Sequence, residues 1–192
     1  MTRESPSPHI LLGVTGSIAA YKAADMIRAM QRKGWTVTVV MTQAATRFIT
    51  PLTLQTLSRN RVYSEMFDAE AEWVPDHIAL ADRTNLVLIA PCTANVMAKL
   101  AHGLADDLLT ATVLACPAPV VVAPAMNDRM WNHPATQANR RLLEERGVRF
   151  VEPSAGDLAC GREGQGRLAD PETILSAVEE ILAHTVKPKG NP

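Results

Sequence analysis

Three polar side chains, far apart in the chain, have types and settings suited to proton transfer or to binding a carboxylate. His77 lies in D-H-I-A-L, where an imidazole could act as a base or as a cation. Asn127 lies in P-A-M-N, a rigid loop that could present its amide to a ligand. Cys160 lies among four glycines between positions 156 and 166, and a thiol on a mobile lid could donate a proton.

Each of these side chains also has a structural interpretation. A lone histidine is most often a surface or core residue, and the proline-flanked loop with Asn127 could be purely structural. The glycine-rich segment could be a linker with a spare thiol at Cys160. Local sequence alone leaves these alternatives open.

A small-residue turn, Gly16-Ser17-Ile18, follows the first apolar run and precedes a helical pattern. Backbone N–H groups in such a turn can approach a phosphate, and the dipole of the following helix favours an anion. A plain tight turn is the alternative. Because G-V-T-G-S-I lacks the dinucleotide spacing G-x-G-x-x-G, the turn favours a mononucleotide over a dinucleotide.

Further polar and aromatic residues follow the next strands. The Thr42 hydroxyl could bond a phosphate, and the Phe48 ring could cover a flat cofactor. The small or polar residues after the third long strand could contact a ring edge; they are Cys92, Thr93, Ala94 and Asn95. Helix capping by Thr42, Thr93 or Asn95, and core packing by Phe48, are equally compatible with the local sequence.

The elements that position these residues alternate along the chain. Short apolar runs without alternation predict buried parallel strands at 10–14, 36–41, 86–90, 120–123 and 148–151. Helical spacing predicts helices at 19–33, 51–58, 95–102, 108–115, 135–146 and 170–182, with 59–76 irregular. Strands joined by such long crossovers predict an α/β fold, a flavodoxin-like or Rossmann-like doubly wound parallel sheet. Ligands bind beyond the carboxyl ends of such strands.

Composition sets limits on the organisation and the partners. The 192 residues, 47% of them hydrophobic, suit a single three-layer domain, which we expect at 9–184 between flexible ends at 1–8 and 185–192. A net charge of −1 makes nucleic acid and anionic membranes unlikely partners. The chain has three cysteines and no C-x-x-C pair, which predicts neither a metal site nor a disulfide framework but a cytoplasmic protein with reduced thiols.

Five segments, taken in order, resemble the homo-oligomeric flavin-containing cysteine decarboxylases. The similarity covers about residues 10–182 and is greatest to the members that act on 4′-phosphopantothenoylcysteine. The segments are G-V-T-G-S-I-A-A-Y-K, D-H-I-A-L-A, A-P-C-T-A-N-V-M-A-K-L-A-H-G-L-A-D-D-L-L, A-P-A-M-N-D-R-M-W and L-A-C-G-R-E-G-Q-G-R-L-A-D-P. One departure is Cys92, which stands where the family pattern has Ala, a change small enough to leave flavin binding intact.

The resemblance implies a role for each matching residue. FMN is the implied cofactor, bound by Gly16, Ser17, Ile18, Thr42, Phe48, Cys92, Thr93, Ala94, Asn95 and Ala123. The implied catalytic residues are the base His77, the carboxylate-binding Asn127 and the proton donor Cys160, which should converge on one face of the flavin. Substrate contacts are implied for Asn127, Met130, Ala159 and Gly161.

The implied reaction is decarboxylation of 4′-phosphopantothenoylcysteine to 4′-phosphopantetheine, a step of coenzyme A synthesis. The family implies a homo-oligomer, a trimer or a dodecamer, with the flavin at a subunit interface. An alternative is a peptidyl-cysteine decarboxylase, but those relatives lack the flap that carries Cys160. Another is a non-catalytic regulatory subunit, which the presence of His77, Asn127 and Cys160 disfavours. Flavin prenyltransferases share the fold but differ at the His77 and P-A-M-N positions.

Overall fold

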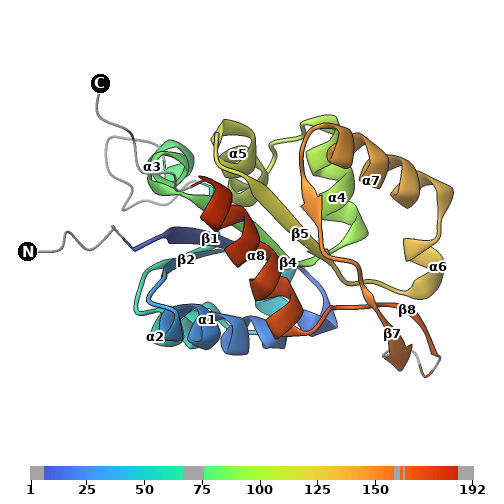
Figure 1. The fold of residues 1–192 in the computed structure, drawn as a ribbon, viewed down its shortest axis with the longest axis horizontal. Coiled ribbons are helices and arrows are strands. Elements are labelled where there is room, and N and C mark those ends of the chain that lie inside the picture. Colours follow the sequence, from blue (N-terminus) through green and yellow to red (C-terminus); the bar gives the residue numbers. More distant parts are fainter. Residues whose placement is uncertain (1–6, 67–75, 158–160, 162, 186–192) are drawn as a thin grey trace, which may run out of the picture.

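The computed structural model describes residues 7–66, 76–157, 161 and 163–185, and Figure 1 shows its ribbon. The predicted flexible ends, 1–8 and 185–192, fall almost wholly outside these ranges. Thr185 is the last residue of the final helix, one position beyond the expected domain boundary. None of the helices in the described ranges combines the length and the apolar character needed to cross a bilayer.

Six parallel strands form the main sheet, in the order β3-β2-β1-β4-β5-β6. They are β1 (His9–Val14), β2 (Thr36–Met41), β3 (Val62–Tyr63), β4 (Leu86–Cys92), β5 (Val120–Pro124) and β6 (Arg149–Phe150). The five predicted strands are present, and β3 is a two-residue addition within the segment expected to be irregular. Without that edge strand the order is that of flavodoxin-like sheets, with the switch point between β1 and β4.

The helices connect these strands. The first crossover begins as a 3-10 helix, η1 (Ile18–Lys22), and continues as α1 (Ala23–Arg32). A second 3-10 helix, η2 (Ala45–Arg47), follows β2. The others are α2 (Pro51–Ser58), α3 (Asp76–Arg83), α4 (Ala94–His102), α5 (Leu108–Ala115), α6 (Asp128–Trp131), α7 (Pro134–Glu145) and α8 (Pro171–Thr185). The helices α3 and α6 were not predicted; α6 has only four residues, too few for helical periodicity to stand out.

Two hydrophobic cores, one on each face of the sheet, make the three-layer arrangement. Successive residues of β1 point to opposite faces, so Ile10 and Leu12 join one core and Leu11 joins the other. The first core is covered by α1, α2 and α8, and the second by α3, α4, α5 and α7 (Figure 1). Burial on both faces explains why these strands are apolar throughout rather than alternating.

A two-stranded antiparallel hairpin, β7 (Ser154–Asp157) with β8 (Glu163–Arg167), stands apart from the sheet. The sequence predicted a mobile glycine-rich loop over this whole segment, and that prediction is wrong for the described strands. Gly164 and Gly166 lie on β8, where the absence of a side chain allows close packing rather than mobility. Figure 1 shows the hairpin next to α6, at the far end of the molecule from α3.

Candidate active site

Two cavities lie side by side at the carboxyl edge of the sheet and share the wall residues Gly16, Thr93 and Met130. The first cavity, of about 670 Å³, is bordered by η1, the segment 125–130 and the end of β8. The second cavity, of about 610 Å³, is bordered by residues 42–44, 64–66, the start of α4 and the start of α5. Volumes of this size suit a cofactor or a small metabolite.

The shared wall is built at the switch point between β1 and β4. The buried Thr15 hydroxyl donates a hydrogen bond to Pro91 O at 2.7 Å and accepts one from Thr93 N at 3.0 Å. The next residue, Gly16, has no room for a side chain, because a Cβ there would lie 2.4 Å from the Ala44 Cβ. The turns that follow β1, β2 and β4 are therefore held against one another.

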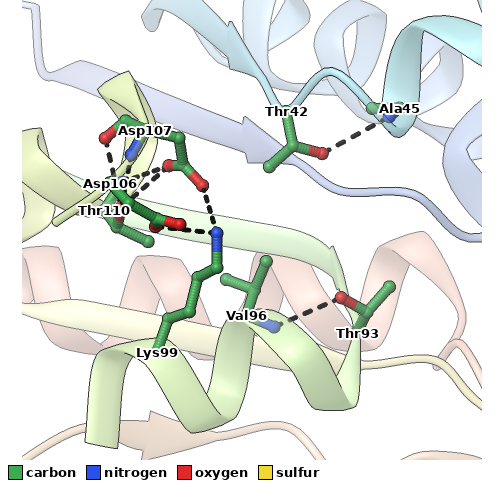
Figure 2. Close-up of polar contacts among 8 residues, drawn as sticks. All are labelled: Thr42, Ala45, Thr93, Val96, Lys99, Asp106, Asp107 and Thr110. Atoms are coloured by element: carbon green, nitrogen blue, oxygen red, sulfur yellow. Dashed lines mark hydrogen bonds and ion pairs between the residues drawn. The ribbon is translucent and has the colours of Figure 1, made fainter. Parts of the chain in front are cut away.

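The hydroxyls predicted to bind a cofactor also accept backbone hydrogen bonds at the starts of helices, and Ser17 and Thr93 are N-caps. Ser17 Oγ accepts from Ala19 N at 3.3 Å and caps η1. Figure 2 shows the same arrangement at Thr42 with Ala45 N (3.3 Å) and at Thr93 with Val96 N (3.4 Å). The capping interpretation and the cofactor interpretation are compatible, because a hydroxyl oxygen that accepts from a backbone N–H still has its own proton to donate.

A lysine with two carboxylates forms part of the second cavity. Lys99 Nζ lies 2.8 Å from Asp106 Oδ1 and 3.0 Å from Asp107 Oδ2 (Figure 2). The hydrogen bonds that Lys99 donates to Asp106 and Asp107, together with the charges of both carboxylates, raise the pKa of Lys99, although burial opposes this change. Asp107 also caps α5 by accepting from Thr110 N at 2.9 Å. The lysine thus fixes the loop between α4 and α5.

Asn127 borders the first cavity and caps α6, so the predicted loop gives way to a short helix one residue later. Its Oδ1 accepts a hydrogen bond from Arg129 N at 2.9 Å. The other amide atom, Nδ2, is a donor and has the polarity that a carboxylate requires. The cap therefore determines which end of the amide is presented as a donor.

The helix that Asn127 caps is itself held in place. Trp131, at the end of α6, is only 2% exposed, and its carbonyl accepts a hydrogen bond from Gln137 Nε2 at 2.6 Å. The Arg140 guanidinium carbon lies 5.4 Å from the Trp131 ring centroid and 5.7 Å from that of Phe150. This stacking joins α6, α7 and β6 into one support behind the first cavity.

The hairpin also packs directly on the Asn127 segment. Met126 N donates to Gly166 O at 2.9 Å, and a Cβ on Gly166 would lie only 2.2 Å from Met126 O. A Cβ on Gly164 would lie 2.8 Å from the Asp128 Cβ. Two glycines on one face of β8 therefore allow the hairpin to contact the backbone that carries Asn127.

Most of the sequence-predicted site residues come together at this edge. Those that border one or both cavities are Gly16, Ser17, Ile18, Thr42, Thr93, Ala94, Asn95, Asn127 and Met130. Cys92 and Ala123 border neither cavity, because both are fully buried in the strands β4 and β5. Burial raises the pKa of the Cys92 thiol. Phe48 is 48% exposed and also borders neither cavity.

Of the three residues predicted to converge, His77 and Asn127 can be compared, and they lie far apart within one chain. His77 lies on α3 and borders neither cavity. Figure 1 places α3 and α6 at opposite ends of the long axis of the molecule. Cys160 and Ala159 lie outside the described residues. Gly161 is exposed, with φ +76°, and borders neither cavity.

Several cavity residues were not assigned a role from the sequence. Lys22 and Tyr21 of η1 and Arg167 of β8 border the first cavity. Lys99, Asp106 and Asp107 border the second. Lys22 and Lys99 lie in the helices that follow the turns after β1 and β4, and a charge on such a helix is the signal that could have found them.

The chain matches known proteins over nearly its whole length. The model of the family named Flavoprotein matches residues 1–183. The chain is 48% identical over 175 residues to the coenzyme A biosynthesis bifunctional protein CoaBC of Bacillus subtilis, covering 91% of this chain and 43% of that protein. It is 49% identical over 175 residues to a probable phosphopantothenoylcysteine decarboxylase of Streptococcus mutans, covering 90% and 98%. The chain thus spans less than half the length of the bifunctional relative.

Two solved structures have the same fold. One is a PPC decarboxylase mutant complexed with pantothenoylaminoethenethiol, with TM-score 0.82 and 32% identity, covering 91% of this chain and 97% of that one. The other is the FMN-dependent cysteine decarboxylase SpaF, with TM-score 0.81 and 31% identity, covering 94% and 98%. These likenesses confirm the predicted flavodoxin-like fold.

Proposed function

The chain belongs to the flavoprotein family, and from that premise we propose that it is an FMN-dependent decarboxylase of 4′-phosphopantothenoylcysteine, acting in coenzyme A synthesis. The observation that carries this proposal is the 49% identity over 98% of a probable phosphopantothenoylcysteine decarboxylase. The cavity beside Asn127 supports it, because an amide donor at the carboxyl edge of the sheet suits a substrate carboxylate.

FMN suits the residues at this edge. The turn has no side chain at Gly16, which lies against Ala44, so the backbone there can approach a phosphate. Gly16 N–H donates none of the hydrogen bonds found among the described residues. The hydroxyls of Thr42 and Thr93 can donate to a cofactor while they accept from Ala45 N and Val96 N. A mononucleotide also agrees with the G-V-T-G-S-I spacing.

The reaction needs an electron sink, since an unmodified cysteine carboxylate has none. FMN, when bound, supplies the acceptor and later the donor of two electrons. Asn127 Nδ2 would bind the substrate carboxylate while Oδ1 stays on Arg129 N, so that the amide cannot turn over. His77 would remove the thiol proton. Once the substrate thiol is oxidised to a thioaldehyde, carbon dioxide leaves and an enethiol remains. With the two electrons returned as a hydride from the reduced cofactor and a proton from Cys160, the enethiol would become the saturated thiol, so the overall reaction has no net redox change.

A second copy of the chain supplies His77 in this proposal. The location of α3, far from α6 within one chain, supports a homo-oligomer, a trimer or a dodecamer, with the active site between subunits (Figure 1). Exposed apolar side chains are available for such an interface near both regions: Ile18 (59%) and Met130 (49%) at the cavity, and Ile78 (38%) on α3. A cytoplasmic location is part of the proposal, because the relatives are named for coenzyme A biosynthesis.

The first test is the flavin spectrum of the purified protein, followed by mass spectrometry of 4′-phosphopantothenoylcysteine incubated with it. We expect a yellow protein. The product should be lighter than the substrate by the mass of one carbon dioxide and should contain the same number of hydrogen atoms. A colourless protein that does not bind added FMN would contradict the proposal. Turnover of a peptide with a C-terminal cysteine, but not of this substrate, would favour the peptidyl-cysteine alternative.

The role of Cys160 has its own test. Cys160→Ser should still bind FMN and release carbon dioxide, but the enethiol should accumulate because its carbon is not protonated. Normal 4′-phosphopantetheine output from this variant would exclude Cys160 as the proton donor. Cys116→Ser is the matched control, because that half-buried thiol donates to Ala81 O on the α3 side of the molecule and borders neither cavity.

A further inference from the structure

The charged side chains that border the first cavity are all cationic among the described residues. Lys22 comes from η1 and Arg167 from β8, two separate elements of the cavity wall. No aspartate or glutamate of the described ranges accompanies them there. The cavity therefore has an excess of positive charge, although the whole chain has a net charge of −1.

These two charges are poorly balanced by neighbours. Lys22 takes part in none of the ion pairs that the described part of the chain forms. Arg167 Nη2 lies 3.8 Å from Asp170 Oδ1, with 45% and 65% of the two side chains exposed. A pair at that distance and exposure contributes little. Both cations are thus available to a ligand anion.

The second cavity has the opposite arrangement. Its lysine, Lys99, has two carboxylate oxygens within 3.0 Å. A ligand anion would have to compete with Asp106 and Asp107 for that ammonium group. Uncompensated positive charge therefore lies in the first cavity, next to Asn127.

From this difference we propose that Lys22 and Arg167 form a subsite for the phosphate monoester of the substrate. The inference rests on the proposed function, which gives the substrate a carboxylate at one end and a phosphate at the other. Asn127 would bind the first group and the two cations the second. The apolar side chains of Ile18, Tyr21 and Met130 also border this cavity, and they suit the methyl-bearing chain that joins the two groups.

FMN carries a phosphate monoester as well, so the two sources must be distinguished. The turn at Gly16 offers backbone N–H groups to the cofactor phosphate, as proposed above. Lys22 lies four residues beyond Ile18, at the far end of η1, and Arg167 lies on the hairpin. We assign these two side chains to the substrate phosphate, and flavin content provides the check.

The experiment compares Lys22→Met and Arg167→Met with the wild-type holoenzyme on two substrates, 4′-phosphopantothenoylcysteine and pantothenoylcysteine without the phosphate. Each variant should lower kcat/KM for the phosphorylated substrate about 10- to 100-fold, as expected for loss of a hydrogen bond to a charged group. Turnover of the substrate without phosphate, and the FMN content, should change less than twofold. Lys22→Arg should recover most of the activity.

Arg28→Met is the matched control, because this exposed cation on α1 borders neither cavity. It should leave the preference for the phosphorylated substrate intact. Equal losses on both substrates, an unchanged preference, or a loss of FMN from the variants would overturn the subsite. Failure of the wild-type holoenzyme to release carbon dioxide from either compound would instead overturn the proposed function, and the subsite with it.

Discussion

Lys22 and Lys99 each border a cavity at the carboxyl edge of the sheet, yet their surroundings differ. Lys99 Nζ has oxygens of Asp106 and Asp107 at 2.8 and 3.0 Å, whereas Lys22 forms no ion pair among the described residues. Lys99 joins α4 to the loop before α5, whereas Lys22 makes no such link within the described ranges. The comparison shows that a lysine at a cavity wall does not always bind a ligand. Lys99 is neutralised by two carboxylates and stabilises the fold, whereas Lys22 has no such partner among the described residues and can bind an anion.

The largest effect is expected when negative charge enters the first cavity. Asn127→Asp should keep α6, because aspartate caps a helix as well as asparagine does. It should lower kcat/KM by about 10³-fold, because a carboxylate then faces the substrate carboxylate in place of a donor. The measurement is steady-state kinetics on the FMN-loaded protein. The matched control is Asn132→Asp, because Asn132 follows α6 and borders neither cavity. If Asn127→Asp kept a tenth of the wild-type activity, Asn127 would not be part of the site.

The wall shared by the two cavities is tested next. Gly16→Ala places a Cβ 2.4 Å from the Ala44 Cβ and should separate the turns after β1 and β2. We expect FMN affinity to fall about tenfold, a loss typical of overpacking a tight contact. Fluorescence titration with FMN measures it. Adding Ala44→Gly to this variant removes the methyl group that the new Cβ would overlap, and it should restore part of the FMN affinity. No restoration in the double variant would mean that the turn itself is distorted.

The second cavity should respond in stability rather than in substrate binding. Lys99→Met leaves Asp106 and Asp107 without their cation and should lower Tm by about 3 °C. The KM for 4′-phosphopantothenoylcysteine should stay the same. Lys33→Met is the control, since its ion pair with Glu179 is on the surface, and it should shift Tm by less than about 1 °C. A large rise in KM for Lys99→Met would abolish the distinction between the two lysines.

The smallest effect concerns His9, at the start of β1 and remote from both cavities. Burial and the charge of Arg83 lower its pKa. The unfolded chain therefore takes up the proton at a higher pH than the folded one, and the folded state loses stability as the pH falls below about 6.5. We expect His9→Gln to reduce the fall in Tm between pH 7.5 and 5.5 by about 1–2 °C. An identical fall in both proteins would show that other groups cause it.

Sequence patterns predicted the sheet well because its strands are buried on both faces. Residues 36–41 and 51–58 were predicted with the bounds that the structure shows, and the first, third and fourth strands within two residues. The hairpin was missed because β7 and β8 contain mostly small or polar residues and bury few side chains. Its position depends on contacts of Gly164 and Gly166 with a segment almost 40 positions earlier, which no local window contains.

The residues of the candidate site also fall into those that local sequence could locate and those that depend on folding. Gly16, Ser17, Thr93 and Asn127 follow strands or cap helices, so strand ends located them correctly at the edge of the sheet. The convergence of His77 with Asn127 could not be judged from the sequence, because it depends on where α3 packs. Charge balance at Lys22 and Lys99 was also out of reach, since it depends on neighbours brought together by folding.

The frame of the first cavity depends on hydrogen bonds to the main chain. Thr15 bonds the backbone on either side of Cys92, and Met126 bonds the backbone of Gly166. The side chains at the mouth, Ile18, Tyr21 and Met130, are about half exposed and belong to neither contact. A gene encoding this fold can therefore accumulate substitutions at the mouth without loosening the scaffold. A change of substrate toward other thiol acids would therefore require few mutations, and directed evolution should begin with Ile18, Tyr21 and Met130.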